Sequence, residues 1–268
     1  MLYGGMLRSP YAHAQVKAID VTKARSIPGV YTVLTYGDLQ KTRSWAGYMY
    51  LTDRVRYVGD VVAIAAADSR ETLEKALKAI EVSYEELPGV FTIEEAMAEG
   101  APLVHEDRET NIHEPSHFRI RKGNVDDGFA KCDVVINREY RTNFVEHAYL
   151  EPEAVVALPN PTDGVMTVYS SSQNPYLTRR WVADALGVSI NQVRVVQQTL
   201  GGCFGGKEEG VGLIASRAAL LARLTNKPVK IVMTREDSIL ESTKRHQIRF
   251  RYKVGAAKEG RILALEAE

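Results

Sequence analysis

Apolar residues in the first hundred positions of the chain follow two kinds of pattern in turn, one typical of strands and one typical of helices. Residues 61–67 form an uninterrupted apolar run, which is typical of a buried strand. Directly after it, apolar residues repeat at helical spacing over residues 70–80, and Asp68-Ser69 is placed to cap that helix. The same patterns predict strands at residues 15–19, 30–34 and 81–84 and a short helix at residues 21–26. These elements describe a mixed α/β domain.

The middle of the chain, from about residue 90 to residue 129, is richer in polar and turn-forming residues and is typical of a linker. After it, the patterns predict strands at residues 134–140, 154–158, 165–170, 193–197, 229–234, 247–254 and 262–266 and helices at residues 175–186 and 207–224. We therefore expect an α/β (α+β) protein with one domain at residues 1–100, a linker at residues 101–130 and a second domain at residues 131–268.

Composition narrows the range of functions. The 268 residues include 34 basic and 34 acidic residues, so no excess of positive charge favours nucleic acid as a partner. The two cysteines, Cys132 and Cys203, lie far apart and outside any zinc or iron–sulfur spacing, which favours a reducing compartment. No apolar run reaches the roughly 20 residues that span a membrane, and no secretory leader is recognisable. We expect a cytoplasmic protein that binds neither nucleic acid nor membrane.

Other polar residues carry no clear chemistry. His113 and His117 are spaced like ligands on a helix, but Pro115 lies between them, so they do not predict a metal site. His147 is interpreted as a hydrogen-bonded structural residue. The mixture of charges over residues 235–249 predicts a solvated surface or a contact between domains.

The most informative stretch is GGCFGGKE, residues 201–208, between a β-branched strand and the second long helix. Glycines permit backbone geometry that other residues avoid and let a ligand approach the main-chain amides. The start of a helix adds unpaired N–H groups and a field that favours an anion. The loop therefore either holds a phosphate or an oxo-anion or only makes a tight turn.

Residues 201–207 also fit the first seven positions of the phosphate-binding P-loop pattern. That pattern continues with Ser or Thr, which binds magnesium, whereas Glu208 stands here. A carboxylate beside a triphosphate is repulsive, so the sequence does not favour a nucleotide hydrolase.

A second candidate residue, Gln173, lies between a predicted strand and a predicted helix. Asn174 is a suitable N-cap, Pro175 fits the first turn, and Gly187 follows the last turn. Gln173 is thus expected at the carboxyl end of a strand, where α/β folds commonly assemble sites. Its amide either bonds a ligand, as donor and acceptor at once, or only stabilises the turn.

Several separated motifs together resemble the molybdenum-binding subunit of the xanthine dehydrogenase and aldehyde oxidase family. In chain order they are LRSPYAHA (7–14), PGV (28–30), YVGD (57–60), EHAYLEP (146–152), SQNP (172–175), ALGV (185–188) and GGCFGGKE (201–208). The separation from Gln173 to Glu208, 208 − 173 = 35 residues, is similar to that of the family. The resemblance covers essentially the whole chain and implies an α/β hammerhead domain followed by the first part of a molybdopterin-binding α/β domain.

The resemblance also implies roles for individual residues. Gln173 donates a hydrogen bond to an oxo ligand of molybdenum, and Gly202, Phe204 and Gly205 place backbone amides against the oxygen ligands and the pterin dithiolene. Cys203, whose amide is expected to bind the cofactor as well, is a departure, because a third glycine is usual there and the backbone must accept a β-carbon. In this family molybdenum takes its sulfur ligands from the pterin and an inorganic sulfido group. The resemblance therefore does not predict that the Cys203 thiolate binds the metal.

Glu208 has two interpretations. By resemblance it points into the substrate pocket and bonds a ring nitrogen or carbonyl of a heterocycle, and purine-type substrates fit better than aldehydes. Alternatively, it is a solvated glutamate in the first turn of a helix, where the helix dipole favours it.

Cofactors and partners follow from the resemblance as well. It implies molybdopterin, in its plain or its cytosine dinucleotide form, with iron–sulfur clusters and FAD in other domains or subunits. The general-base glutamate of the family lies in sequence beyond the position of Glu268, together with the remainder of the molybdenum subunit. We therefore expect a part of a hydroxylase that is inactive by itself. The alternative is a non-catalytic assembly or interaction module of the same fold.

Overall fold

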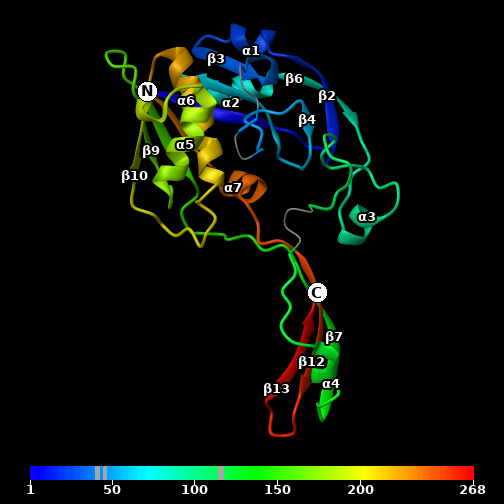
Figure 1. The fold of residues 1–268 in the computed structure, drawn as a ribbon. Helices are drawn as coiled ribbons and strands as arrows, with labels where there is room; N and C mark the ends of the chain where they lie inside the picture. Colours follow the sequence, from blue (N-terminus) through cyan, green and yellow to red (C-terminus); the bar gives the residue numbers. More distant parts are fainter. Residues whose placement is uncertain (40–42, 45–46, 114–117) are drawn as a thin grey trace.

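A seven-stranded sheet in the order β10-β9-β8-β11-β1-β5-β3 runs through the main body of the molecule (Figure 1). The computed structural model describes residues 1–39, 43–44, 47–113 and 118–268. Two three-stranded sheets, β4-β2-β6 and β13-β12-β7, complete the fold.

The strands are β1 (Leu2–Arg8), β2 (Ala14–Asp20), β3 (Val30–Thr35), β4 (Arg54–Val55), β5 (Val61–Ala67), β6 (Glu81–Glu86), β7 (Val134–Thr142), β8 (Ala154–Pro159), β9 (Met166–Ser170), β10 (Val193–Gln197), β11 (Val229–Val232), β12 (Ile248–Ala256) and β13 (Ile262–Ala267). The helices are α1 (Thr22–Ser26), α2 (Arg70–Lys78), α3 (Ile93–Met97), α4 (Val125–Phe129), α5 (Pro175–Leu186), α6 (Gly210–Thr225) and α7 (Arg235–Glu241), with 3-10 turns η1 (Tyr36–Asp38) and η3 (Ile190–Gln192).

The elements with the strongest local patterns lie where the sequence predicts them. All seven residues of β5 are buried, as expected for its apolar run. The Ser69 hydroxyl caps α2 by accepting a hydrogen bond from the Thr72 amide. Helix α5 spans the predicted residues, with the Asn174 side chain as its N-cap and Gly187 in the left-handed conformation at its end. The predicted α/β class is confirmed.

Strand β1 was not predicted, although it lies inside the large sheet, between β11 and β5. It pairs antiparallel with β5 and parallel with β11, so it joins strands from the two predicted domains. The glycines inside β1 weaken its sequence signal, and packing explains them. A β-carbon on Gly4 would lie 2.8 Å from the Ile231 side chain, and one on Gly5 would lie 3.0 Å from Leu73. The division at residues 100 and 130 stays a prediction.

Helix α6 begins at Gly210, not at residue 207 as predicted. The carbonyl of Lys207 accepts a hydrogen bond from the backbone amide of Gln173 and is thus engaged outside the helix. Helix α6 then packs against the large sheet and against α5, with most of its residues buried. It is 16 residues long, and no helix in the described part of the chain is both long and apolar enough to cross a membrane.

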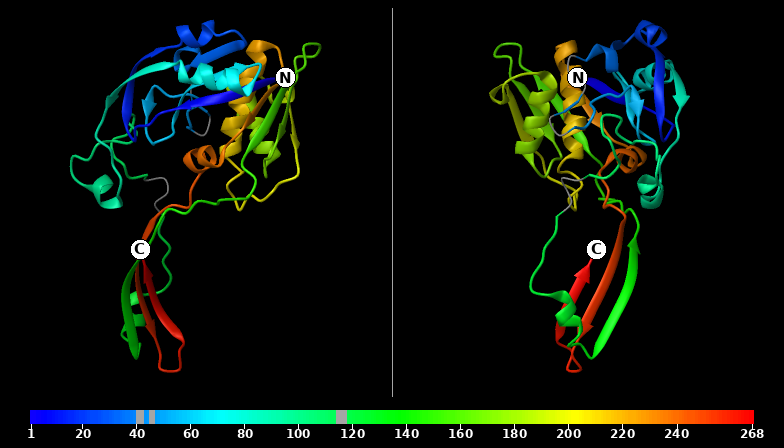
Figure 2. Two further views of the ribbon diagram at one scale, coloured as in Figure 1. Left: turned by 180° about the vertical axis from the view of Figure 1, so that it is seen from behind. Right: turned by 45° about the vertical axis from the view of Figure 1, so that its right-hand side comes forward.

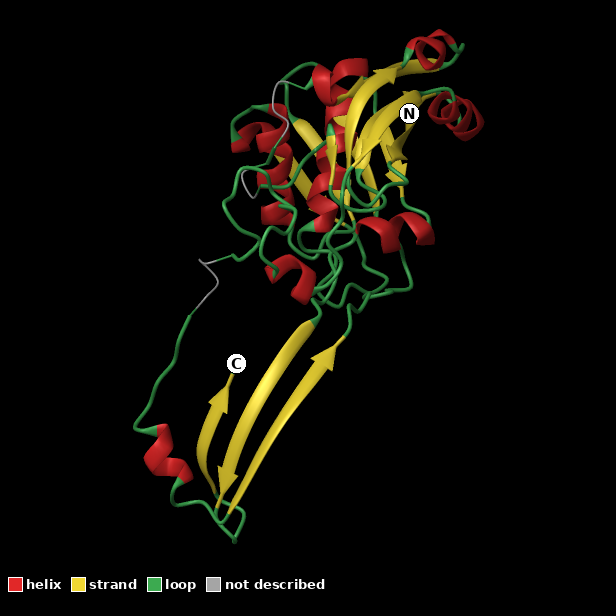
Figure 3. Cartoon of the chain, turned by 90° about the vertical axis from the view of Figure 1, so that its right-hand side faces the viewer, coloured by secondary structure: helices red, strands yellow, loops and turns green. Residues whose placement is uncertain are grey.

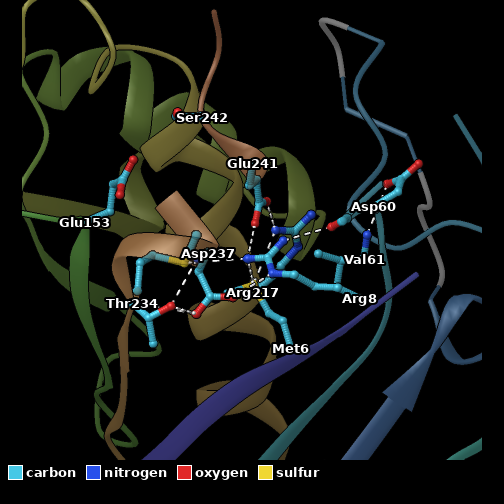
Figure 4. Close-up of polar contacts among 12 residues, drawn as sticks. Met6, Arg8, Asp60, Val61, Glu153, Arg217, Thr234, Asp237, Glu241 and Ser242 are labelled. Carbon is cyan, nitrogen blue, oxygen red and sulfur yellow. Dashed lines mark hydrogen bonds and ion pairs between the residues drawn. The ribbon is translucent and has the colours of Figure 1, made fainter. Parts of the chain in front are cut away.

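Residues 235–249 were predicted to form a solvated surface or a contact between domains, and for the first part of this range the structure favours the contact. Residues 235–241 form α7, and the Glu241 carboxylate is buried between Arg217 of α6 and Arg8 of β1 (Figure 4). Arg8 also bonds Asp237 at 2.7 Å. Burial alone raises the pKa of Glu241, but the two guanidinium groups outweigh it and hold the pKa of that carboxyl below its ordinary value. This buried cluster ties the first part of the chain to the second.

The sheet of β7, β12 and β13 projects away from the main body (Figures 2 and 3). Helix α4, at the end of the predicted linker, packs against its β13 edge strand. Strand pairing places Ile136 opposite Val254 and Tyr140 opposite Phe250 on one face. Ile136 and Tyr140 are 52% and 55% exposed, so this sheet presents an uncovered apolar surface.

Candidate functional site

The glycine loop, residues Gly201–Lys207, connects β10 with the start of α6. Three of its residues have left-handed backbone conformation: Gly202 (φ +94°), Phe204 (φ +47°) and Gly205 (φ +95°). This conformation costs glycine little but costs a residue such as Phe204 about 1 kcal/mol or more, which often marks a functional site. Cys203 has no positive φ, so the loop accepts its β-carbon at the position where a glycine was expected.

The amides of residues 202–205 are open to a ligand. They donate to no acceptor within the described residues, whereas the Gly201 amide bonds Glu151 and the Gly206 amide bonds the Cys203 carbonyl at 2.8 Å. The Phe204 side chain is 75% exposed. Consecutive free N–H groups in a loop of this shape favour an anionic or oxo ligand.

Gln173 lies next to this loop, between β9 and α5. Its backbone amide donates to the carbonyl of Lys207 at 3.1 Å. Its side-chain Oε1 is buried and has no hydrogen-bond partner within the described residues. A buried amide atom without a partner is unfavourable, and rotating the amide would place its Nε2 donor at the same position. The structure thus brings the predicted Gln173 and glycine loop together, through the bond from the Gln173 amide to Lys207.

Glu208 lies two residues before α6, so it is solvated, as the alternative interpretation expects, but it is not in the first helical turn. Its side chain is exposed and accepts a hydrogen bond from Asn174 Nδ2 at 3.2 Å. Asn174 follows Gln173 directly in the chain. Glu208 is therefore held near Gln173, with a carboxylate that remains accessible to solvent.

The floor of the glycine loop is a segment whose role the sequence did not reveal, residues 147–151. A β-carbon on Gly206 would lie 2.8 Å from Tyr149 and 2.9 Å from His147, so only glycine fits there. Glu151 bonds the Gly201 amide at 2.8 Å and the Lys207 ammonium at 3.2 Å. The residues 146–152 motif was recognised, but no local signal pairs Glu151 with a lysine that follows it by 56 positions.

A pocket of about 610 Å³ lies beside the site. Its lining is mainly apolar and comprises Tyr48, Tyr57, Val58, Phe144, Glu146, Trp181, Glu209, Gly210, Leu213, Ile239, Leu240, Glu241, Ser242, Thr243 and Lys244. Neither Gln173 nor Glu208 is part of this lining. At its edge burial alone raises the pKa of Glu146, but hydrogen bonds from Lys244 and Ser242 outweigh it and hold that pKa below its ordinary value.

Metal-ligating side chains do not gather in the part of the chain that the structure describes, where no group of three or more His, Cys, Asp or Glu residues is arranged to hold an ion. Cys203 is a free, half-buried thiol. His147 donates through its backbone amide to the Glu146 carboxylate at 3.0 Å, whereas its buried Nδ1 has no hydrogen-bond partner among the described residues, so its structural role stays a prediction. His117 lies outside the described residues.

Two domain families match the chain. Residues 1–88 match the α/β hammerhead domain of aldehyde oxidase and xanthine dehydrogenase. Residues 104–268 match the molybdopterin cofactor-binding domain.

Individual proteins are similar over the whole chain. The large molybdopterin subunit of nicotinate dehydrogenase from Eubacterium barkeri is 39% identical, over 100% of this chain and 63% of that protein. The xanthine dehydrogenase of Emericella nidulans is 34% identical, over 100% of this chain and 19% of that protein. The crystal structure of a Cu,Mo-CO dehydrogenase superimposes with a TM-score of 0.88 at 28% identity, over 100% of this chain and 36% of that chain. The chain thus spans less than two thirds of the length of these relatives.

Proposed function

Because the chain belongs to the xanthine dehydrogenase and aldehyde oxidase family of molybdopterin-binding proteins, we propose that it forms part of a hydroxylase that inserts an oxygen atom from water into an electron-poor carbon of an N-heterocycle. The observation that carries the proposal is a set of polar groups without a partner among the described residues, namely the amides of residues 202–205 and Gln173 Oε1. Main-chain donors and a side-chain amide suit a ligand that is rich in oxygen atoms.

The residues present fit molybdopterin. The amides of Gly202, Cys203, Phe204 and Gly205 would bind the oxygen ligands and the pterin, and the Gln173 amide would bond an oxo ligand. When bound, the group supplies a metal-centred oxidation that no amino-acid side chain can perform. The protein fixes its orientation through these main-chain donors, whose geometry is set before the ligand arrives.

Cofactor form and partners belong to the same proposal. We propose molybdopterin in its plain or its cytosine dinucleotide form, with iron–sulfur clusters and FAD in other domains or subunits. The remainder of a molybdenum subunit, which would carry the general base, would cover the apolar face of β7, β12 and β13. Isolated residues 1–268 would accordingly show no turnover. Both cysteines are free thiols, which supports a reducing, cytoplasmic location.

The experiment that tests this function is metal and pterin analysis. We expect the chain, produced in cells that make molybdenum cofactor and purified with the polypeptides that accompany it, to contain molybdenum and pterin in equal amounts. The complex should oxidise hypoxanthine or nicotinate with an artificial electron acceptor. A complex without molybdenum would leave the non-catalytic module as the better interpretation, and turnover of aldehydes alone would change the substrate class.

We propose that Glu208 recognises the heterocycle, because its carboxylate is accessible and lies next to Gln173. In the complex that contains cofactor, Glu208→Val should lower kcat/KM for hypoxanthine roughly 30-fold. This corresponds to a loss of about 2 kcal/mol of transition-state stabilisation, the cost of a lost hydrogen bond to a charged group. Molybdenum content should stay near that of the wild type, since Glu208 is not expected to contact the metal ligands.

The matched variant is Gln173→Ala. Gln173 precedes Asn174 in the chain, and the Asn174 side chain bonds Glu208. This variant should lower turnover of purines and aldehydes to the same extent, because the Gln173 amide would act on the cofactor and not on the substrate. Equal losses for both substrates in Glu208→Val, or no loss, would contradict the role proposed for Glu208.

A further inference from the structure

Lys207, the last residue of the glycine loop, is completely buried. Its ammonium lies 3.2 Å from Glu151 Oε1 and 4.6 Å from the centre of the Tyr149 ring. A buried lysine is unfavourable without such partners. Its charge is thus directed into the floor of the loop, so it is not available to an anion held by the loop amides, in contrast to the lysine of a P-loop.

The same carboxylate holds the opposite end of the loop. Glu151 Oε2 accepts the Gly201 amide at 2.8 Å, and the Glu151 amide donates to the Gly201 carbonyl at 3.2 Å. A β-carbon on Gly201 would lie 2.5 Å from the β-carbon of Glu151, which explains why glycine is needed there. The two oxygens of one side chain therefore bridge the first and last residues of the glycine loop.

Lys207 also connects this bridge to Gln173. The Lys207 carbonyl accepts the backbone amide of Gln173 at 3.1 Å. A displacement of Lys207 would therefore change the distance between the Gln173 side chain and the free amides of the loop. The position of both groups depends on where Lys207 is held.

We propose that Glu151 and Lys207 form a clasp that closes the glycine loop and sets Gln173 at its working distance from the loop amides. The proposal rests on the function proposed above for that site. Both are positioning residues, since their charged groups bond each other and the backbone of the loop. The clasp acts in the protein before the cofactor binds, so it has consequences that can be measured without cofactor.

Two single variants and their double variant distinguish an effect on the position of Gln173 from an effect on the stability of the protein alone. Lys207→Met and Glu151→Gln each leave one charge without its partner, so both should lower the Tm. The double variant removes both charges and should recover most of that loss. It still lacks the bridge, so hydrogen exchange at the Gln173 and Gly206 amides should remain about tenfold faster than in the wild type. Molybdenum retained per chain should remain about tenfold lower.

Glu151→Asp keeps the charge but shortens the side chain by one methylene, so it cannot reach both ends of the loop. We expect a smaller loss of Tm than for Glu151→Gln, because the negative charge stays near Lys207, with faster exchange at Gln173 and reduced molybdenum. Lys17→Met and Glu85→Gln provide controls, because this ion pair is exposed on the small sheet of β2 and β6. These controls should leave exchange at Gln173 and metal content unchanged.

The outcomes distinguish the clasp from the proposed function. If the double variant or Glu151→Asp shows wild-type exchange at Gln173 and wild-type molybdenum content, the pair is only structural and the clasp is overturned. If the wild type itself takes up no molybdenum, the proposed function fails, while the exchange rates still decide whether the clasp closes the loop.

Discussion

Replacement of Arg217 by methionine should lower the free energy of unfolding by about 3–5 kcal/mol, the cost of leaving a buried carboxylate without one of its partners. Arg217 and Glu241 are 1% and 2% exposed in their side chains, and Arg217 Nε donates to the Tyr50 carbonyl at 2.8 Å. Methionine fills a similar volume but provides neither charge nor donor. Arg8 remains beside Glu241 and offsets only part of the loss.

Urea unfolding of the two proteins provides the measurement. Lys75→Met is the matched control, because its partner Glu71 and Lys75 itself are 79% and 63% exposed. Water screens such a pair, so this variant should unfold close to the wild type. A loss of less than about 1 kcal/mol for Arg217→Met would mean that Arg8 alone is a sufficient partner for Glu241, and the role of Arg217 in joining the two parts of the chain would be refuted.

The second large effect concerns pH and Asp60. Burial raises the pKa of Asp60 to about 6, although backbone hydrogen bonding and nearby Arg217 oppose this. The native protein therefore keeps a proton on Asp60 between about pH 4 and pH 6, where the unfolded chain has lost it. The native state binds more protons in this window, so the contribution of Asp60 to stability falls as the pH rises through it. The shift of about two units corresponds to about 3 kcal/mol.

Asp60→Asn isolates this contribution, since an amide has a similar shape and does not ionise. The stability of the variant relative to the wild type should increase by up to about 3 kcal/mol from pH 4 to pH 6 and stay constant above that range. Loss of the hydrogen bonds that Asp60 accepts from Arg56 and Val61 adds only an offset that does not depend on pH. A difference that does not change from pH 4 to pH 7 would contradict the raised pKa.

The sequence alone determined the elements whose burial pattern or caps can be recognised from neighbouring residues in the chain. The apolar run of β5, the stripe of α2 and the caps of α5 are local patterns, because helix and strand geometry repeat over a few residues. The order of the motifs likewise sufficed to recognise the family. Gln173 and the glycine loop were found as candidates because glycine clusters and an amide at the end of a strand are themselves local signals.

Tertiary structure decided everything that depends on residues distant in the chain. Strand β1 exists because β5 and β11 flank it, although its glycines weaken the strand pattern. The end of the glycine loop is set by the bond from Gln173, so α6 begins later than its periodicity suggests. Lys207 and Glu241 look like surface residues in the sequence, yet both are buried, since partners from other elements neutralise them. The residues next to a charged side chain in the sequence do not indicate its ion-pair partner, because the two are brought together only by folding.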